Sequence, residues 1–181
     1  MTFHETKLPG VIEVHLEPKP DERGFFARCW CQKEFENIGL NPKLVQCSLS
    51  FSLRKGTLRG MHYQAEPNAE TKLVRCTKGA IFDVVVDLRH QSPTYRDWIA
   101  VELTAANQKM VYVAQGCGHG FLTLEDESEV FYQMSEFYNP ESARGVRWDD
   151  PAFQIVWPGE VEVISERDRM YPNFKEMQCM Y

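Results

Sequence analysis

The sequence lacks the features that mark several large classes of protein. Its 181 residues include 20 Lys and Arg against 26 Asp and Glu, for a formal net charge of -6. No positive excess is therefore available to hold a phosphate backbone by counterion release. The longest apolar stretch, residues 80–88, is interrupted by Asp83 and falls far short of the roughly 20 apolar residues that cross a bilayer. We expect neither a nucleic-acid partner nor a membrane span.

An export signal is also missing from the start of the sequence. Glu5 and Lys7 stand where the apolar core of a signal peptide would lie. We therefore expect a cytoplasmic protein whose cysteines are thiols, because disulfides are rare in a reducing compartment. The six cysteines are at positions 29, 31, 47, 76, 117 and 179.

Short metal and cofactor motifs are absent as well. The five histidines, at positions 4, 15, 62, 90 and 119, show no H-x-H or H-x-x-x-H spacing, and no C-x-x-C occurs. The chain has no glycine-rich dinucleotide or phosphate loop and no G-x-S-x-G elbow. We expect no metal and no cofactor.

What the sequence does contain is strand-forming runs between frequent turn signals such as Lys55-Gly56 and Lys78-Gly79. The runs are rich in Val, Ile and aromatic residues, and several alternate apolar with polar positions. They cover residues 11–16, 44–52, 72–77, 80–88, 98–103, 110–114, 120–124, 129–138 and 154–158.

The clearest helix candidate is residues 32–40, with Phe35 and Ile38 on one side and Gly39 as its stop signal. No repeated strand-helix alternation supports a doubly wound sheet. The pattern therefore predicts one all-β domain over residues 1–181, a β-sandwich or barrel of the jelly-roll kind with a few short helices.

Charged residues inside the apolar strands are the first candidates for a site. Lys72 shares a face with apolar neighbours of its strand, which is unusual for an ammonium group in a purely structural strand. The alternative is a lysine on an edge strand, where its charge blocks aggregation. Asp83 and Asp87 lie four residues apart on one face, where a buried carboxylate needs a hydrogen-bond donor. The simpler interpretation is structural ion pairs with Arg75 or Arg89.

Two histidines and two tyrosines add polar chemistry. His62 lies in the segment RGMHYQ, and His119 lies between glycines, which allow the backbone to approach a ligand closely or to make a tight bend. Tyr132 and Tyr138 are an even number of residues apart, so a continuous strand would place both on one face. Phenols in a cavity can act as general acids, although a structural role is commoner for a buried tyrosine.

Ten short motifs, in order along the chain, together resemble the dTDP-4-dehydrorhamnose 3,5-epimerase family. They are DERGFF (21–26), VQCSLS (45–50), LRGMHYQ (58–64), KLVR (72–75), FDVVVDLR (82–89), SPT (92–94), GHGF (118–121), Tyr132 with Phe137-Tyr138, WDDP (148–151) and SERD (165–168). The resemblance implies a metal-free, cupin-like jelly roll, usually a homodimer with a shared site. It also implies epimerisation at C3, C5 or both of a nucleotide-linked 4-keto-6-deoxyhexose, first of all dTDP-4-dehydro-6-deoxyglucose.

The same resemblance assigns the catalytic roles. It makes His62 the general base, Asp168 its orienting partner, Lys72 the stabiliser of an enolate and Tyr132 the acid. These residue types suit the reaction, because a proton next to a ketone is acidic only when negative charge can move onto the carbonyl oxygen. Inversion then needs a proton delivered to the opposite face of the carbon.

Seven further residues are assigned by resemblance to the substrate. Arg59 and the partner chain's Arg23 would bind the diphosphate, for which a guanidinium fork is suited. Phe26 of the partner chain and Tyr138 of the same chain would lie against the nucleotide base. Gln46 and His119 are assigned to the phosphate and sugar region, and Ser48 is expected near the nucleotide or sugar.

The sequence departs from the family pattern at four places. The family commonly has Asn at Ser48, an acidic residue near Ala143, Gln-Gly where this chain has Glu70-Thr71, and a Pro-Glu-Gly-type turn at residues 114–117. Ser48 and Ala143 leave the exact substrate open, because they are expected near the nucleotide or sugar. A CDP-linked sugar, or epimerisation at one carbon only, fits equally well. A non-catalytic sugar-binding jelly roll is disfavoured by the intact catalytic set, and a metal-dependent cupin by the missing histidine pair.

Overall fold

The strand-forming runs assemble into two six-stranded sheets in the computed structural model, which describes residues 1–174. The first sheet has the order β1 (Thr2–Glu5), β2 (Ile12–His15), β10 (Met110–Val113), β7 (Lys72–Lys78), β12 (Ser128–Met134) and β5 (Gln46–Ser52). The second has the order β13 (Ala143–Gly145), β6 (Thr57–Gln64), β11 (Cys117–Thr123), β8 (Ala80–Asp87) and β9 (Trp98–Thr104), with β14 (Val163–Ile164) beside β6.

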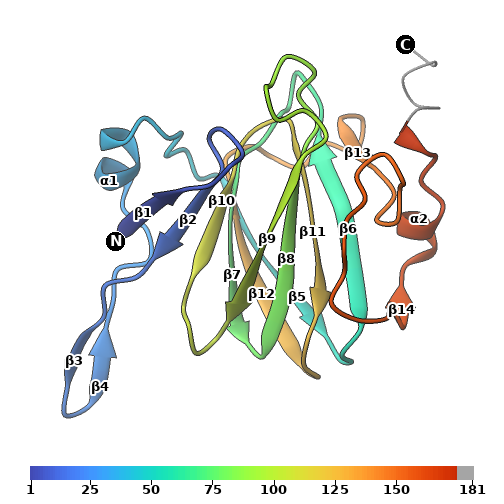
Figure 1. Cartoon of the computed structure of the whole chain (residues 1–181). Helices are drawn as coiled ribbons and strands as arrows, with labels where there is room; N and C mark the ends of the chain where they lie inside the picture. The colour runs from blue at the N-terminus through green and yellow to red at the C-terminus, as the bar shows by residue number, and fades with distance from the viewer. Residues whose placement is uncertain (175–181) are drawn as a thin grey trace.

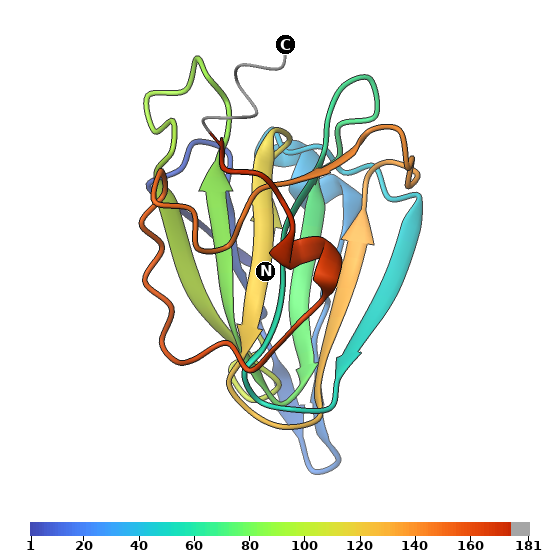
Figure 2. The same ribbon diagram turned by 90° about the vertical axis from the view of Figure 1, so that its right-hand side faces the viewer.

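The two sheets pack face to face as a jelly-roll sandwich (Figures 1 and 2). Val74 and Val130 of the first sheet meet Ile81, Val85 and Phe121 of the second in one apolar cluster. Alternation along each strand directs these side chains inward, and burial of each stabilises the fold by about 1.5–3 kcal/mol. The predicted all-β class is confirmed.

One predicted strand, residues 154–158, is wrong. This segment forms no strand, but Ile155 and Trp157 pack on the outer face of the second sheet, against a cluster that includes Val84 and Val86 of β8. Val156 between them is 72% exposed, which reproduces the alternation of a strand. The covering segment also explains why β8 reads as a nearly continuous apolar run, since both of its faces are buried.

The described chain contains two short helices, α1 (Gln32–Asn37) and α2 (Glu166–Arg169). The first is shorter than predicted, because Ile38 already leaves the helical conformation as its C-cap and is 45% exposed rather than packed beside Phe35. Neither helix is long and apolar enough to span a membrane. Cys179, and the end of the domain predicted for residues 1–181, lie outside the described residues.

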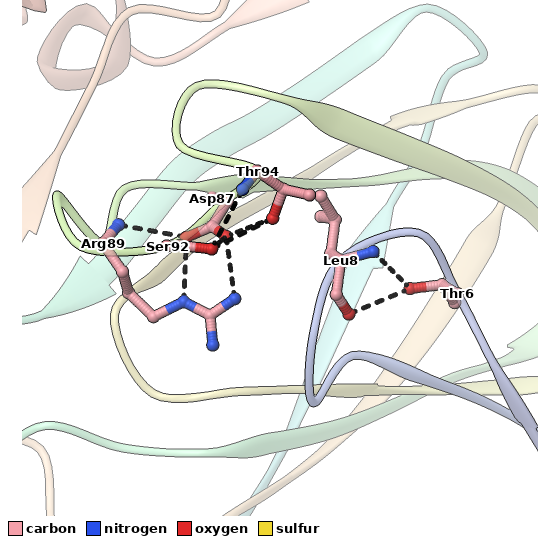
Figure 3. Close-up of polar contacts among 6 residues, drawn as sticks. All are labelled: Thr6, Leu8, Asp87, Arg89, Ser92 and Thr94. Carbon is pink, nitrogen blue, oxygen red and sulfur yellow. Dashed lines mark hydrogen bonds and ion pairs between the residues drawn. The ribbon is translucent and has the colours of Figure 1, made fainter.

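A buried carboxylate closes the loop between β8 and β9 (Figure 3). Asp87 is fully buried and accepts hydrogen bonds from the Arg89 guanidinium, with Nε–Oδ1 and Nη2–Oδ2 distances of 2.8 Å, and from the hydroxyls of Ser92 and Thr94. Burial alone would raise the pKa of this carboxyl, but the donors outweigh it and lower the pKa to about 2. The predicted ion pair with Arg89 is confirmed.

A separate two-stranded hairpin, β3 (Lys19–Asp21) and β4 (Gly24–Phe26), projects from the body of the molecule (Figure 1). All six of its strand residues are exposed. A two-stranded hairpin is marginal by itself in water, so this arm is suited to packing against another surface.

Candidate active site

A cavity of about 520 Å³ opens between the two sheets and the C-terminal segment. A smaller chamber of about 230 Å³ adjoins it, and three residues line both: His62, Tyr132 and Arg167. His62 comes from β6 in the second sheet, whereas Tyr132 comes from β12 in the first. The proposed base and acid therefore stand on facing sheets.

His62 is paired with a carboxylate from the far end of the chain. Its Nε2 lies 2.6 Å from Asp168 Oδ1, and the second oxygen of Asp168 accepts the main-chain N–H of Gly60 at 3.3 Å. Ser165 caps α2 by accepting the Asp168 N–H, which fixes the carboxylate in place. Nε2 donates to this carboxylate, which leaves Nδ1 able to accept a proton.

The environment of Asp168 keeps it ionised. Burial alone would raise the pKa of its carboxyl, but the hydrogen bond and charge of His62, with a further hydrogen bond from Gly60, lower the pKa below its ordinary value. An ionised carboxylate fixes the tautomer and the orientation of the imidazole to which it is bonded.

Lys72 is held on the floor of the smaller chamber. It begins β7, which lies between β10 and β12, so the alternative of an edge lysine is wrong. Its Nζ lies 3.0 Å from Glu70 Oε1 and donates to the main-chain oxygen of His62 at 3.4 Å. The ammonium group thus lies beside the strand that carries His62.

Tyr132 is backed by a second histidine-aspartate pair. His119 Nε2 lies 2.7 Å from Asp83 Oδ2, both side chains are buried, and the His119 ring contacts the Tyr132 ring edge-on at 6.2 Å. Burial and the negative charge of Asp83 raise the pKa of Tyr132 above its ordinary value. The predicted pairing of Asp83 with an arginine is wrong, since Asp83 points between the sheets while Arg75 follows the inward-facing Val74 and points away.

The substrate residues predicted within one chain fall into two groups. Arg59 lines the larger cavity, and Gln46 and Tyr138 line the smaller chamber. Ser48 lies on β5 opposite Tyr132, whereas His119 is only 4% exposed and lines neither cavity. The substrate contacts of all five remain predictions.

Tyr138 does not share a strand with Tyr132, because β12 ends at Met134. Instead, the main-chain N–H of Tyr138 donates to the side chain of Gln46, which brings the two predicted substrate residues together. The even spacing that suggested one continuous strand is therefore misleading here.

Arg23 and Phe26 lie on the projecting hairpin, with 84% of the Arg23 side chain and 71% of Phe26 exposed. Arg23 pairs with Asp21 of the same hairpin, and neither Arg23 nor Phe26 lines the cavities beside His62. Within one chain they are not part of the site.

Several residues that line the two cavities were not predicted from the sequence, notably Arg167, Ser50 and Arg144. Arg167 lies inside the motif SERD, next to Asp168, and Ser50 lies two residues beyond Ser48 on the same face of β5. Among residues 1–174, no three His, Cys, Asp or Glu side chains are grouped as metal ligands would be. Independence from a metal remains a prediction.

The fold is a cupin-like jelly roll, and its two adjoining cavities bring together a histidine–aspartate pair, a lysine and a tyrosine. The family model described as dTDP-4-dehydrorhamnose 3,5-epimerase matches residues 5–176, and the chain belongs to that family.

Similar proteins carry related names. A dTDP-4-dehydrorhamnose 3,5-epimerase of Sinorhizobium fredii is 43% identical over 182 residues, covering 100% of this chain and 93% of its own. A dTDP-4-dehydrorhamnose 3-epimerase of Streptomyces niveus is 40% identical over 170 residues, which cover 93% of this chain and 82% of its own. The crystal structure of a 3,5-epimerase from Legionella pneumophila, in complex with dTDP-4-keto-L-rhamnose, superimposes with a TM-score of 0.92 at 32% identity, covering 99% and 95%.

Proposed function

We propose that this protein is an isomerase that epimerises a nucleotide-linked 4-keto-6-deoxyhexose, most simply dTDP-4-dehydro-6-deoxyglucose, in deoxysugar biosynthesis. One observation carries the proposal: His62 and Tyr132 face a common cavity from opposite sheets, with Lys72 beside them. A sugar held between the sheets would meet a base on one face and an acid on the other.

The reaction follows from these positions. His62 removes the proton from the carbon next to the ketone, and the electrons of that C–H bond move onto the carbonyl oxygen, where the Lys72 ammonium stabilises the charge. Tyr132 then donates its proton to the opposite face as the electrons return to form the new C–H bond. Exchange with solvent water then restores the protonation of both side chains. Because the carbon loses one proton and gains another, the reaction involves no net oxidation and the proposed mechanism uses no cofactor.

Tyr132 is protonated at neutral pH, as a residue must be before it can donate a proton. Burial and the charge of Asp83 raise the pKa of its phenol above the ordinary value, so the proton is in place when the enolate forms.

Isotope exchange tests this function and identifies the carbon. We expect dTDP-4-keto-6-deoxyglucose, incubated with the protein in D2O, to acquire deuterium at C3, C5 or both, as read by proton NMR. The CDP-linked sugar is the comparator, because Ser48 and Ala143 leave the nucleotide open. Binding without exchange of either sugar would support a sugar-binding jelly roll instead.

We further infer that the protein acts as a homodimer whose hairpins reach into the partner's cavity. The exposed arm carrying Arg23 and Phe26 supports this, because its residues have no role in their own chain's site. An exposed apolar face lies at the edge strand β5, where Leu49 and Phe51 of the strand and Leu53 just after it are 63%, 49% and 65% exposed. A second copy would cover such a face and would bring the same arm in return.

Complementation between inactive variants tests the shared site. His62→Ala and Arg23→Ala proteins, mixed under conditions that exchange subunits, should regain at most about a quarter of wild-type activity, because one site in each heterodimer carries neither lesion. The matched control is His62→Ala mixed with Lys72→Met, since both residues belong to one chain's cavity and every site then keeps a lesion. Recovery in neither mixture would refute the shared site.

We also place the reaction in the cytoplasm. In support, all five cysteines of the described residues are free: Cys29, Cys31, Cys47, Cys76 and Cys117. Thiols that remain unpaired are typical of proteins in a reducing compartment.

A further inference from the structure

Glu70 supplies the negative charge that is paired with Lys72 in the smaller chamber. Among the described residues that line this chamber, Glu70 is the one carboxylate, whereas Lys72, Arg144 and Arg167 all bring positive charge. Of these three cations, Lys72 is the one that forms an ion pair with it, at 3.0 Å. The Lys72 and Glu70 side chains are only 12% and 11% exposed, so the pair is largely shielded from water.

Lys72 is held by one ion pair and one hydrogen bond. Its Nζ lies 3.0 Å from Glu70 Oε1 in the ion pair, and one of its three N–H donors bonds the main-chain oxygen of His62. These two contacts restrict a flexible four-carbon side chain to one position and leave N–H donors available to a group bound in the chamber. Without Glu70, one weak contact at 3.4 Å would hold Nζ.

The backbone around Glu70 is anchored on both sides. The carbonyl of Ala69 accepts the Gln115 side-chain amide at 2.9 Å, and the N–H of Thr71 donates to Ser135 Oγ at 2.8 Å. The Ser135 N–H returns a bond to the Thr71 carbonyl at 3.0 Å. A carboxylate supported in this way can fix its partner, because precise placement of a reacting group depends on a rigid supporting layer.

We propose that Glu70 is a positioning residue for Lys72: its negative charge holds the ammonium beside His62 so that a free N–H of Lys72 meets the enolate oxygen of the substrate. This role rests on the proposed epimerase function, and it acts only through Lys72. Since enolate formation precedes both isotope exchange and inversion, displacement of Lys72 slows the two processes together.

Four variants test the proposal in the D2O exchange assay at saturating dTDP-4-keto-6-deoxyglucose. Glu70→Ala should lower exchange and inversion equally, by about tenfold or more, with KM little changed, because a misplaced catalytic group costs rate rather than binding. Glu70→Gln removes the negative charge while keeping the shape of the side chain, so it should lower exchange and inversion by a similar factor. Glu70→Ala added to Lys72→Met should cause less than about a twofold further loss, because its partner is already gone.

Lys78→Met is the matched control, at the opposite end of the same strand. It breaks an exposed ion pair with Glu127 and should leave exchange unchanged. Normal exchange in Glu70→Ala or in Glu70→Gln, or an undiminished effect of Glu70→Ala in the Lys72→Met background, would each overturn the positioning role.

Crystal structures of the two Glu70 variants supply a test that needs no substrate. Lys72 Nζ should move by about 1 Å or more in both variants. An unmoved Nζ in Glu70→Ala would refute the proposal even if the wild type acted on another sugar. Absence of exchange in the wild type, with Nζ displaced as expected, would count against the proposed substrate alone.

Discussion

The Asp87 cluster yields a stability prediction whose size follows from the structure. Asp87→Asn removes the charge that accepts hydrogen bonds from Arg89, Ser92 and Thr94 while keeping the shape of the side chain. The pKa of Asp87 falls from 3.8 to about 2 on folding, and each pKa unit corresponds to about 1.4 kcal/mol. The ionised carboxylate therefore stabilises the folded chain by about 2 kcal/mol at neutral pH.

The sign of the pH dependence is fixed by the direction of the shift. Because the folded-state pKa is the lower one, the stabilisation is complete above about pH 5 and is lost as the pH falls toward about 2. Urea unfolding at one protein concentration should show Asp87→Asn about 2 kcal/mol less stable than the wild type at pH 7, and about half that difference at pH 3.

A surface ion pair provides the control for this experiment. Asp149 also binds an arginine, Arg147, at 2.7 Å, but its side chain is 36% exposed. Asp149→Asn should therefore cost less than about 1 kcal/mol at either pH. A difference between the wild type and Asp87→Asn that stays constant from pH 7 to pH 3 would refute the assignment of the stabilisation to the ionised carboxylate.

Three catalytic variants separate the proposed roles. His62→Asn should reduce deuterium exchange by more than about 10²-fold with dTDP binding retained, because no other described base lies beside it; near-normal exchange in a folded variant would remove His62 from this role. Lys72→Met should lower turnover by an amount typical of one lost oxyanion donor, about 3–4 kcal/mol, with little change in nucleotide affinity; a collapse of affinity at unchanged turnover would assign Lys72 to the phosphates. Tyr132→Phe should preserve exchange while inversion falls much further, and equal losses would contradict a division of labour with His62.

Several strands were predictable because one of their faces is buried against the body of the protein. Residues 11–16 alternate as such a strand should, and they contain β2. Residues 154–158 alternate for a different reason, since they cover a sheet without joining one. Periodicity reports burial, not hydrogen bonding, so it cannot distinguish these two cases.

The site was predictable only in part from local pattern. His62 and Asp168 are 106 residues apart, and no spacing rule links them; the resemblance of whole motifs supplied that pair. The bond between Asp83 and His119 was missed because it runs between neighbouring strands. Glu70 was singled out only as a departure from the family pattern, since its contact with Lys72 depends on how the chain enters β7.

The two faces of β5 carry different kinds of side chain. Gln46 and Ser50 point toward the cavities, while Leu49 and Phe51 point outward from the sheet edge. Because the side-chain period of a strand is two, a register shift of one residue in β5 would exchange the two sets and turn apolar side chains toward the cavities. Substitutions along this strand can therefore alter the cavity lining and the outer surface independently, but a register shift by an odd number of residues alters both at once.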